Sequence, residues 1–289
     1  MRLGSFTRGW RATVNRRRSA LTFFGLVFGW SWLWWLAAGL TGVPVTEPPA
    51  TTLALIGGLG PLLAAVLLVW RHYQPEERHE FWRRIWDPVR VGWRWWLLIV
   101  LAGAGPTLIG WLVTSGGDLG IGVSSTAAAS VGVFIWLVFA AGAALVEEPG
   151  WRGYALDALL KRHSLAVSSV ALGVVWALWH LPQFFLEGTY QHDEVGFATG
   201  LFWMFMAAII VQTFLYVWVV TSTSGSILAA IVFHALTNLA GELFDPDPGS
   251  RLVALIIWVA MAVGLGFYWR RRPNRSSPHP LKASRGVPV

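Results

Sequence analysis

Four side chains able to act on a peptide bond lie inside or next to long apolar stretches of this 289-residue sequence. They are Glu147, His180, His234 and Asn238. A carboxylate near a histidine can take a proton from water and produce a nucleophile. A second histidine and an amide can donate hydrogen bonds to a developing oxyanion. This set would suffice to hydrolyse an amide without a covalent intermediate.

The acidic pair is followed by a basic residue at helical spacing. Glu148 and Arg152 are four residues apart, so on a continuing helix they share a face and can form an ion pair. That arrangement leaves Glu147 pointing elsewhere. Pro149 lacks a backbone N–H and crowds the preceding turn, so a kink is expected beside the glutamates. An interfacial position, with both acids paired to nearby arginines, is the alternative to a buried site.

The histidines also belong to pairs at helical spacing. Trp176 precedes His180 by four residues, and His234 precedes Asn238 by four, so each pair lies on one helix face. A single histidine or asparagine in a membrane helix often serves only packing or interhelical hydrogen bonding. An acidic pair, two histidines and an amide on three separate helices favour a site, because unpaired polar groups are costly in a bilayer.

A depth estimate supports the same grouping. Glu147 lies 16 residues before His163, and His180 lies 16 residues after Ser164. If the chain turns between His163 and Ser164 and both arms are helical, each side chain lies about 24 Å from that turn. The acid and the imidazole are therefore expected at one level of the membrane.

The same residues could instead bind a metal ion. Glu147, His180 and His234 together could hold a divalent ion such as zinc, which lowers the pKa of a bound water toward about 7. Spacing alone does not separate the two chemistries. The chain contains no His-Glu-x-x-His or Gly-x-Ser-x-Gly motif, and the absence of cysteine excludes a thiol nucleophile or a Cys-ligated zinc.

The composition requires a membrane to surround these residues. Hydrophobic residues make up 55% of the chain, charged residues 13%, and the mean hydropathy is +0.54. Soluble domains are about 25% charged, so a soluble enzyme, a disordered chain and a fibrous repeat are excluded. The charge-free runs are 19–46, 48–70, 95–117, 119–146, 163–186, 195–241 and 252–269.

Those runs predict an all-α, polytopic membrane helix bundle. Each is long enough for one crossing of about 20 residues, and 195–241 is long enough for two, with a turn at the Ser/Thr-rich residues 221–226. About eight transmembrane helices result. No run shows the period-2 alternation of a membrane barrel.

The basic residues predict the orientation. Arginine and lysine gather before the first run, between the second and third, between the fourth and fifth, and after the last, whereas the opposite side is acidic and has one arginine, Arg251. Both termini are therefore expected in the cytoplasm. The net charge of +7 then indicates orientation and contact with anionic lipid, not nucleic acid. Arginine outnumbers lysine, which favours a prokaryotic protein of the inner or plasma membrane.

The expected organisation has five parts. These are a basic cytoplasmic segment (1–18), transmembrane helices 1–3 with their loops (19–124), a core of helices 4–7 that carries the site (125–245), a last transmembrane helix (246–272) and a disordered basic tail (273–289).

The motifs of the core resemble those of a known family. In order they are Glu-Glu-x-x-x-Arg ending at Arg152, an aromatic-x-x-x-His ending at His180, and His-x-x-x-Asn ending at Asn238. Over residues 125–245 the sequence resembles the CPBP intramembrane proteases, which include CAAX prenyl endopeptidases and the bacterial Abi proteins linked to bacteriocin processing and self-immunity. One position departs from the family pattern, because Phe is commoner than Trp where this chain has Trp176.

The resemblance implies a role for each residue. Glu147 and His180 would activate water, His234 and Asn238 would form the oxyanion site, and Arg152 would anchor the second glutamate. The expected function is that of an intramembrane endopeptidase acting on a membrane peptide or protein.

Two other functions stay open at this point. A non-catalytic membrane scaffold or self-immunity factor could keep the same fold. A proton- or ion-coupled transporter could use the same polar residues, although it predicts matching polarity in both halves of the chain, and polarity is found only in the second half.

Overall fold

The computed structural model describes residues 19–116, 127–244 and 247–271. The predicted basic segment 1–18 and tail 273–289 lie outside these residues. Within the described ranges the chain is helical and contains no strand, which confirms the predicted all-α class. The helices are α2 (Ala20–Gly39), α3 (Ala50–Gly58), α4 (Gly60–His72), α5 (Pro75–Trp86), η1 (Pro88–Arg90), α6 (Trp93–Thr114), α7 (Ala127–Glu148), η2 (Pro149–Ala155), α8 (Leu156–Leu160), α9 (Leu165–Trp179), η3 (Leu181–Phe185), η4 (Gln191–Val195), α10 (Gly200–Ser222), α11 (Ile227–Phe244) and α12 (Pro248–Arg270).

Every predicted run contains a helix, and the long run 195–241 holds two. The turn expected at 221–226 separates α10 from α11. In the described part of the chain, six helices are long and apolar enough to cross a membrane, and the bent pair α3 and α4 would make seven. The chain therefore has the helices of a multi-pass membrane protein. The count of eight, which would need α7 as a further span, stays a prediction.

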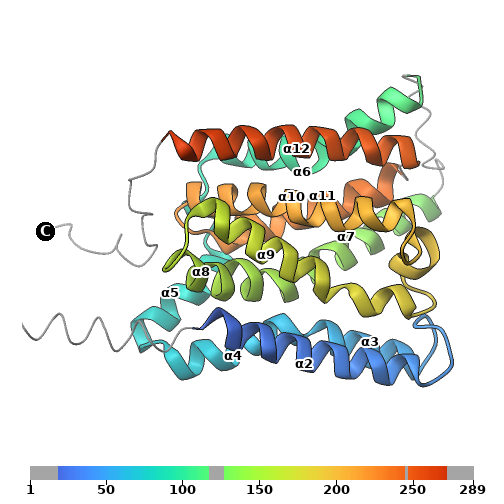
Figure 1. The fold of residues 1–289 in the computed structure, drawn as a ribbon, viewed down its shortest axis with the longest axis horizontal. Helices are drawn as coiled ribbons and strands as arrows, with labels where there is room; N and C mark the ends of the chain where they lie inside the picture. Colours follow the sequence, from blue (N-terminus) through green and yellow to red (C-terminus); the bar gives the residue numbers. More distant parts are fainter. Residues whose placement is uncertain (1–18, 117–126, 245–246, 272–289) are drawn as a thin grey trace, which may run out of the picture.

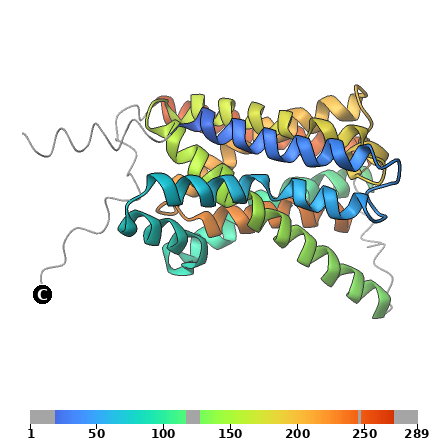
Figure 2. The same ribbon diagram turned by 90° about the horizontal axis from the view of Figure 1, so that it is seen from below.

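The helices run side by side in three layers (Figure 1). The pair α6 and α12 forms one outer layer, α2 to α4 form the other, and α7, α9, α10 and α11 lie between them. Seen from below, α7 leaves the bundle toward its first residues, so only its carboxyl-terminal part packs in the centre (Figure 2). The candidate residues all come from the middle layer.

The two ends of the bundle differ in charge. The helix α5, the first turn of α2 and the last turn of α12 lie together at one end (Figure 1). We call this the basic end, because it carries Arg71, Arg78, Arg83, Arg84, Arg90, Arg94, Lys161, Arg162, Arg270 and Arg271. The opposite, acidic end carries Glu47, Glu187, Asp193, Glu194, Glu242 and Asp247. That the basic end faces the cytoplasm stays a prediction.

A glycine fixes the segment that carries the acidic pair against the outer layer. A Cβ on Gly150 of η2 would lie 2.6 Å from the backbone oxygen of Pro61 in α4. Only glycine allows two backbones to approach this closely. The segment after the glutamates is therefore held directly on α4.

Candidate active site

The helix that carries the glutamates changes its winding immediately after them. Glu148 ends α7, and Pro149–Ala155 continues the chain as a π-helix whose seven residues are all buried. Pro149 cannot donate the next α-helical hydrogen bond, and π-helical segments are frequent at functional sites. The break predicted from Pro149 thus takes the form of a wider helical segment.

Glu148 lies at the centre of a buried polar cluster. Arg152 Nη1 donates to Glu148 Oε1 at 2.8 Å, so the ion pair expected from the i,i+4 spacing is present. His234 Nδ1 lies 2.7 Å from the same oxygen. The guanidinium of Arg152 is also held between the rings of Trp176 and Tyr216, at 3.9 and 3.7 Å from their centroids. The cluster therefore joins α7, η2, α9, α10 and α11.

Glu147 points in a different direction from its neighbour. Trp176 Nε1 donates to Glu147 Oε2 at 2.8 Å, and the other carboxylate oxygen has no hydrogen bond to a described residue. Glu147 lines a cavity of about 490 Å³. Its carboxylate therefore reaches α9 at Trp176, one helical turn before His180, and the depth estimate places it level with His180.

The backbone determines which nitrogen of His180 faces the cavity. His180 follows the last residue of α9, and its Nδ1 lies 2.8 Å from the carbonyl oxygen of Trp176. A carbonyl only accepts, so Nδ1 carries the proton and Nε2 keeps a lone pair. The side chain can thus accept a proton at Nε2 while the backbone fixes its ring.

His234 and Asn238 lie one turn apart on α11. Both line the same cavity as Glu147 and His180. His234 is 5% exposed, Glu147 9% and His180 8%, whereas Asn238 is exposed. The His234 Nδ1 contact with Glu148 leaves Nε2 available to a ligand. The volume of the cavity lies within the usual range of ligand pockets, about 300–1,000 Å³.

The structure adds residues that the sequence search did not select. Tyr216, Gln212, Gln183, Tyr190, Glu242 and Arg251 also line the cavity. Gln212 could have been found, because it is a lone amide within an apolar run. Tyr216 has no such signal, since its role depends on how α10 packs against Arg152. The contact between Glu148 and His234 likewise depends on the packing of α7 against α11.

The predicted metal set is Glu147, His180 and His234. Across the described ranges, no three His, Asp or Glu side chains are grouped so that they could hold a metal ion. One oxygen of Glu147 and the Nδ1 atoms of His180 and His234 contact protein groups, so Nε2 of each histidine is the nitrogen that could bind an ion. The zinc site of these three residues stays a prediction.

Comparisons with known proteins cover the segment that holds this site. Residues 129–240 match the family described as type II CAAX prenyl endopeptidase Rce1-like. The chain is 32% identical over 126 residues to the CAAX prenyl protease 2 of Methanococcus maripaludis. That alignment covers 44% of this chain and 46% of the relative, so the chain matches about half the length of that protein.

All four candidate catalytic residues fall inside the matched residues 129–240. The helices α2 to α6, before the match, and α12, after it, lie outside that range. Over residues 129–240 the chain is therefore similar to the type II CAAX prenyl endopeptidases, in the segment whose motifs resemble that family.

Proposed function

We propose that this protein is an intramembrane endopeptidase that hydrolyses a peptide bond of a membrane peptide or protein. One observation carries the proposal. Glu147, His180, His234 and Asn238, from three helices, line a single cavity in which three of the four are buried. Packing alone does not explain four convergent groups able to move protons and donate hydrogen bonds in an apolar bundle.

Water activation is assigned to Glu147 and His180. The Glu147 oxygen not bonded to Trp176 takes a proton from water, whose oxygen attacks the carbonyl carbon of the scissile bond. His180 Nε2 is oriented to accept a hydrogen bond from the same water. General acid–base groups of this kind contribute about 10²–10⁴-fold to a rate.

Stabilisation of the oxyanion is assigned to His234 and Asn238. The amide of Asn238 donates from its NH₂ group. His234 donates from Nε2 when the ring carries both protons, and its Nδ1 is held by the Glu148 carboxylate at 2.7 Å. Each donor to an oxyanion is worth about 2.7–4 kcal/mol.

Collapse of the intermediate completes the hydrolysis. The carbon–nitrogen bond breaks, and the proton held by Glu147 passes to the leaving amine. The products are a carboxylic acid and an amine, so one water is consumed and the side chains return to their starting states. Throughout the reaction, Glu148 keeps His234 in place, and Arg152 keeps Glu148 in place.

The test uses the purified full-length chain in lipid nanodiscs. Single-pass membrane peptides serve as substrates, and products are identified by mass spectrometry. We expect cleavage by the wild type and loss of cleavage in His180→Ala. His79→Ala changes an exposed histidine of α5 and is the matched control. Equal turnover by His180→Ala would remove that residue from the mechanism.

Two further measurements, an assay of biological activity in cells and a flux assay in liposomes, separate the competing functions. Full biological activity of Glu147→Gln would favour a scaffold or immunity factor. Ion or proton flux into liposomes that depends on Glu147, without cleavage of any peptide, would favour a transporter.

A further inference from the structure

The cavity is lined by elements of only one end of the bundle and its middle. The outer lining comes from η4, the start of α10, the end of α11 and the start of α12, through Gln191, Leu201, Glu242 and Arg251. These segments form the acidic end (Figure 1). None of the lining residues belongs to α5, α8 or the α10–α11 turn, which form the basic end.

The exposed fraction of the lining side chains decreases from the acidic end toward the basic end. Tyr190, Asn238 and Glu242, toward the acidic end, are exposed. Gln212 and Tyr216, farther along α10 toward the basic end, are 7% and 0% exposed. The mouth of the cavity is therefore at the acidic end, where Arg251 donates to the Tyr190 hydroxyl at 2.6 Å.

Packed side chains close the path from the cavity to the basic end. Next to the cavity, Arg152 is fully buried, and so is Trp151. Behind them, a Cβ on Gly153 would lie 2.9 Å from both Phe81 and Ile227, so α5, η2 and α11 are in direct contact. No room is left there for a peptide.

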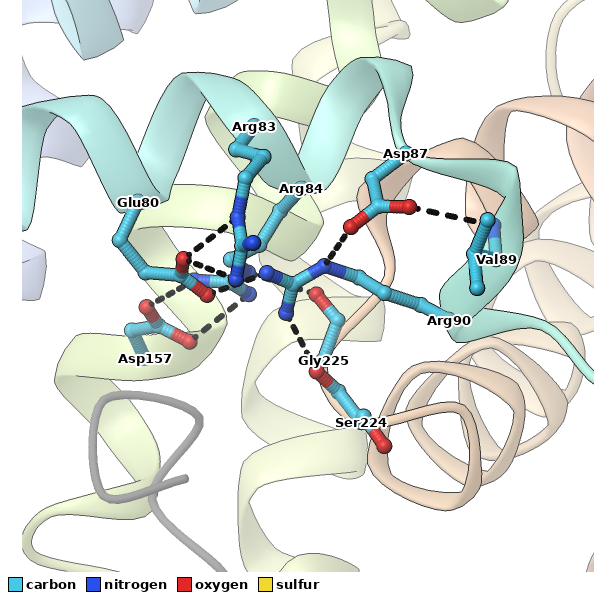
Figure 3. A network of polar contacts seen from close by, with 9 residues as sticks. All are labelled: Glu80, Arg83, Arg84, Asp87, Val89, Arg90, Asp157, Ser224 and Gly225. Carbon is cyan, nitrogen blue, oxygen red and sulfur yellow. Dashed lines mark hydrogen bonds and ion pairs between the residues drawn. The ribbon is translucent and has the colours of Figure 1, made fainter. Parts of the chain in front are cut away.

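An ion pair completes this closure. Arg84 of α5 donates to both carboxylate oxygens of Asp157 on α8, at 2.7 and 3.3 Å. It also donates to the backbone oxygen of Gly225 at 2.6 Å. Figure 3 shows these contacts beside a second set in which Arg90 joins Glu80 to the α10–α11 turn.

The charge of the two ends indicates to which side of the membrane the cavity opens. Lysine and arginine near membrane helices are retained on the cytoplasmic side. Apart from Arg152 in η2 and Arg251 in α12, the basic end carries all the lysine and arginine residues of the described part of the chain. We propose that the cavity opens to the non-cytoplasmic side of the membrane and takes a membrane-anchored peptide presented from that side.

This inference rests on the proposed peptidase function for the identity of the ligand, but not for the direction of access. Exposed apolar lining agrees with an anchored substrate, since Phe139 on α7 is 61% exposed and borders the cavity. An anchored chain can thus lie beside α7 while its extramembrane part enters the mouth.

The native chain has no cysteine, so single cysteines report their own accessibility. Glu194→Cys places a thiol on exposed η4 at the mouth, and Arg162→Cys places one at the basic end. Intact cells expressing each full-length variant are treated with a membrane-impermeant maleimide. We expect labelling of Glu194→Cys in intact cells and of Arg162→Cys only after permeabilisation. His192→Cys, also exposed on η4, replaces Glu194→Cys if the latter does not accumulate.

A third variant tests the cavity itself. Asn238→Cys should react from outside intact cells with a small impermeant thiosulfonate. Outside labelling of Arg162→Cys, or labelling of Asn238→Cys only after permeabilisation, would overturn the proposal.

Two libraries of single-pass reporter proteins test from which side of the membrane the substrate enters. One carries a randomised segment on the outer side of its anchor, and the other carries it on the inner side. We expect Glu147-dependent cleavage only of the outer library. Cleavage of the inner library would refute the access proposal and leave peptidase activity standing. Outward labelling with neither library cleaved would leave the access standing and count against the proposed function.

Discussion

Two adjacent glutamates in this site have different surroundings, and the roles that we propose for them differ accordingly. Glu148 is fully buried and shares one oxygen between Arg152 and His234. Glu147 accepts from Trp176 and lines the cavity. A carboxylate held by a cation and a histidine positions those groups, whereas one that borders a cavity can exchange a proton with water. The two proposed roles differ because adjacent residues of a helix point in different directions.

Asn238 provides a prediction at the scale of one residue. Asn238→Ala removes an amide donor from the cavity wall without creating a buried unpaired charge, because the side chain is exposed. We expect kcat to fall by about 10²–10³-fold with little change in KM, as on loss of one oxyanion donor. Steady-state cleavage by the purified variant measures this. A loss confined to KM would instead assign Asn238 to substrate binding.

Residue types and spacing were sufficient to find the four central residues, because i,i+4 pairs share a helix face and charged groups in apolar runs stand out. The stacking of Arg152 on Tyr216 was beyond reach from the sequence. It depends on how α10 packs, and Tyr216 differs little from other aromatic residues of its run.

At the scale of elements, the ion pair of Arg84 with Asp157 joins α5 to α8 (Figure 3). Burial alone would lower the pKa of Arg84, but the paired carboxylate of Asp157 raises it above its usual value, so the guanidinium stays charged. Arg84→Met leaves a carboxylate that is 7% exposed without its cation. Removing one partner of such a pair costs about 3–5 kcal/mol, and replacing both costs much less.

We therefore expect Arg84→Met to unfold at lower denaturant concentration than the double variant with Asp157→Leu. Unfolding of both proteins in detergent, monitored by tryptophan fluorescence, measures the difference. Arg83→Met is the control, because the side chain of Arg83 is 52% exposed. Equal stability of the single variant and the control would contradict a structural role for the pair.

The start of α12 carries a second element-scale prediction. The side-chain hydrogen bond of Ser250, with others from the Ser250 backbone and from Thr114 of α6, lowers the pKa of Asp247 from 3.8 to about 2. A depressed pKa stabilises the fold above pH 3.8, and this contribution is lost as the pH falls toward 2.

Thermal unfolding across that acid range should show a smaller fall in Tm for Asp247→Asn than for the wild type. The amide cannot titrate, although it keeps one oxygen to cap the helix. Parallel Tm curves for the two proteins would show that Asp247 contributes nothing to the acid response.

The helices themselves were largely predictable, since the charge-free runs and the Ser/Thr-rich turn separate them. The break between α3 and α4 was not, because residues 48–70 read as one uninterrupted apolar run. The bend of 40° falls between Gly58 and Gly60, where Pro61 also removes a backbone donor. The π-helical winding after Glu148 could not be foreseen either, since a proline predicts a break but not its form.

In the whole molecule, hydrophilic groups from α7, α9 and α11 line one pocket, where we propose that a peptide is hydrolysed. Buried charge at the basic end closes one side of this pocket, and the other side opens among acidic residues. The distribution of charged residues in the sequence predicted a basic and an acidic end of the bundle. The end at which the cavity opens could be found only from the packing of the helices.

The most direct test is the cleavage rate of purified Glu147→Gln in nanodiscs. The substitution keeps size and shape and removes only the ability to accept a proton. Glu76→Gln, an exposed glutamate of α5, is the matched control. We expect a fall of about 10²–10⁴-fold for Glu147→Gln with unchanged thermal unfolding, and no change for the control. Cleavage by Glu147→Gln at the wild-type rate would show that this carboxylate does not activate the water.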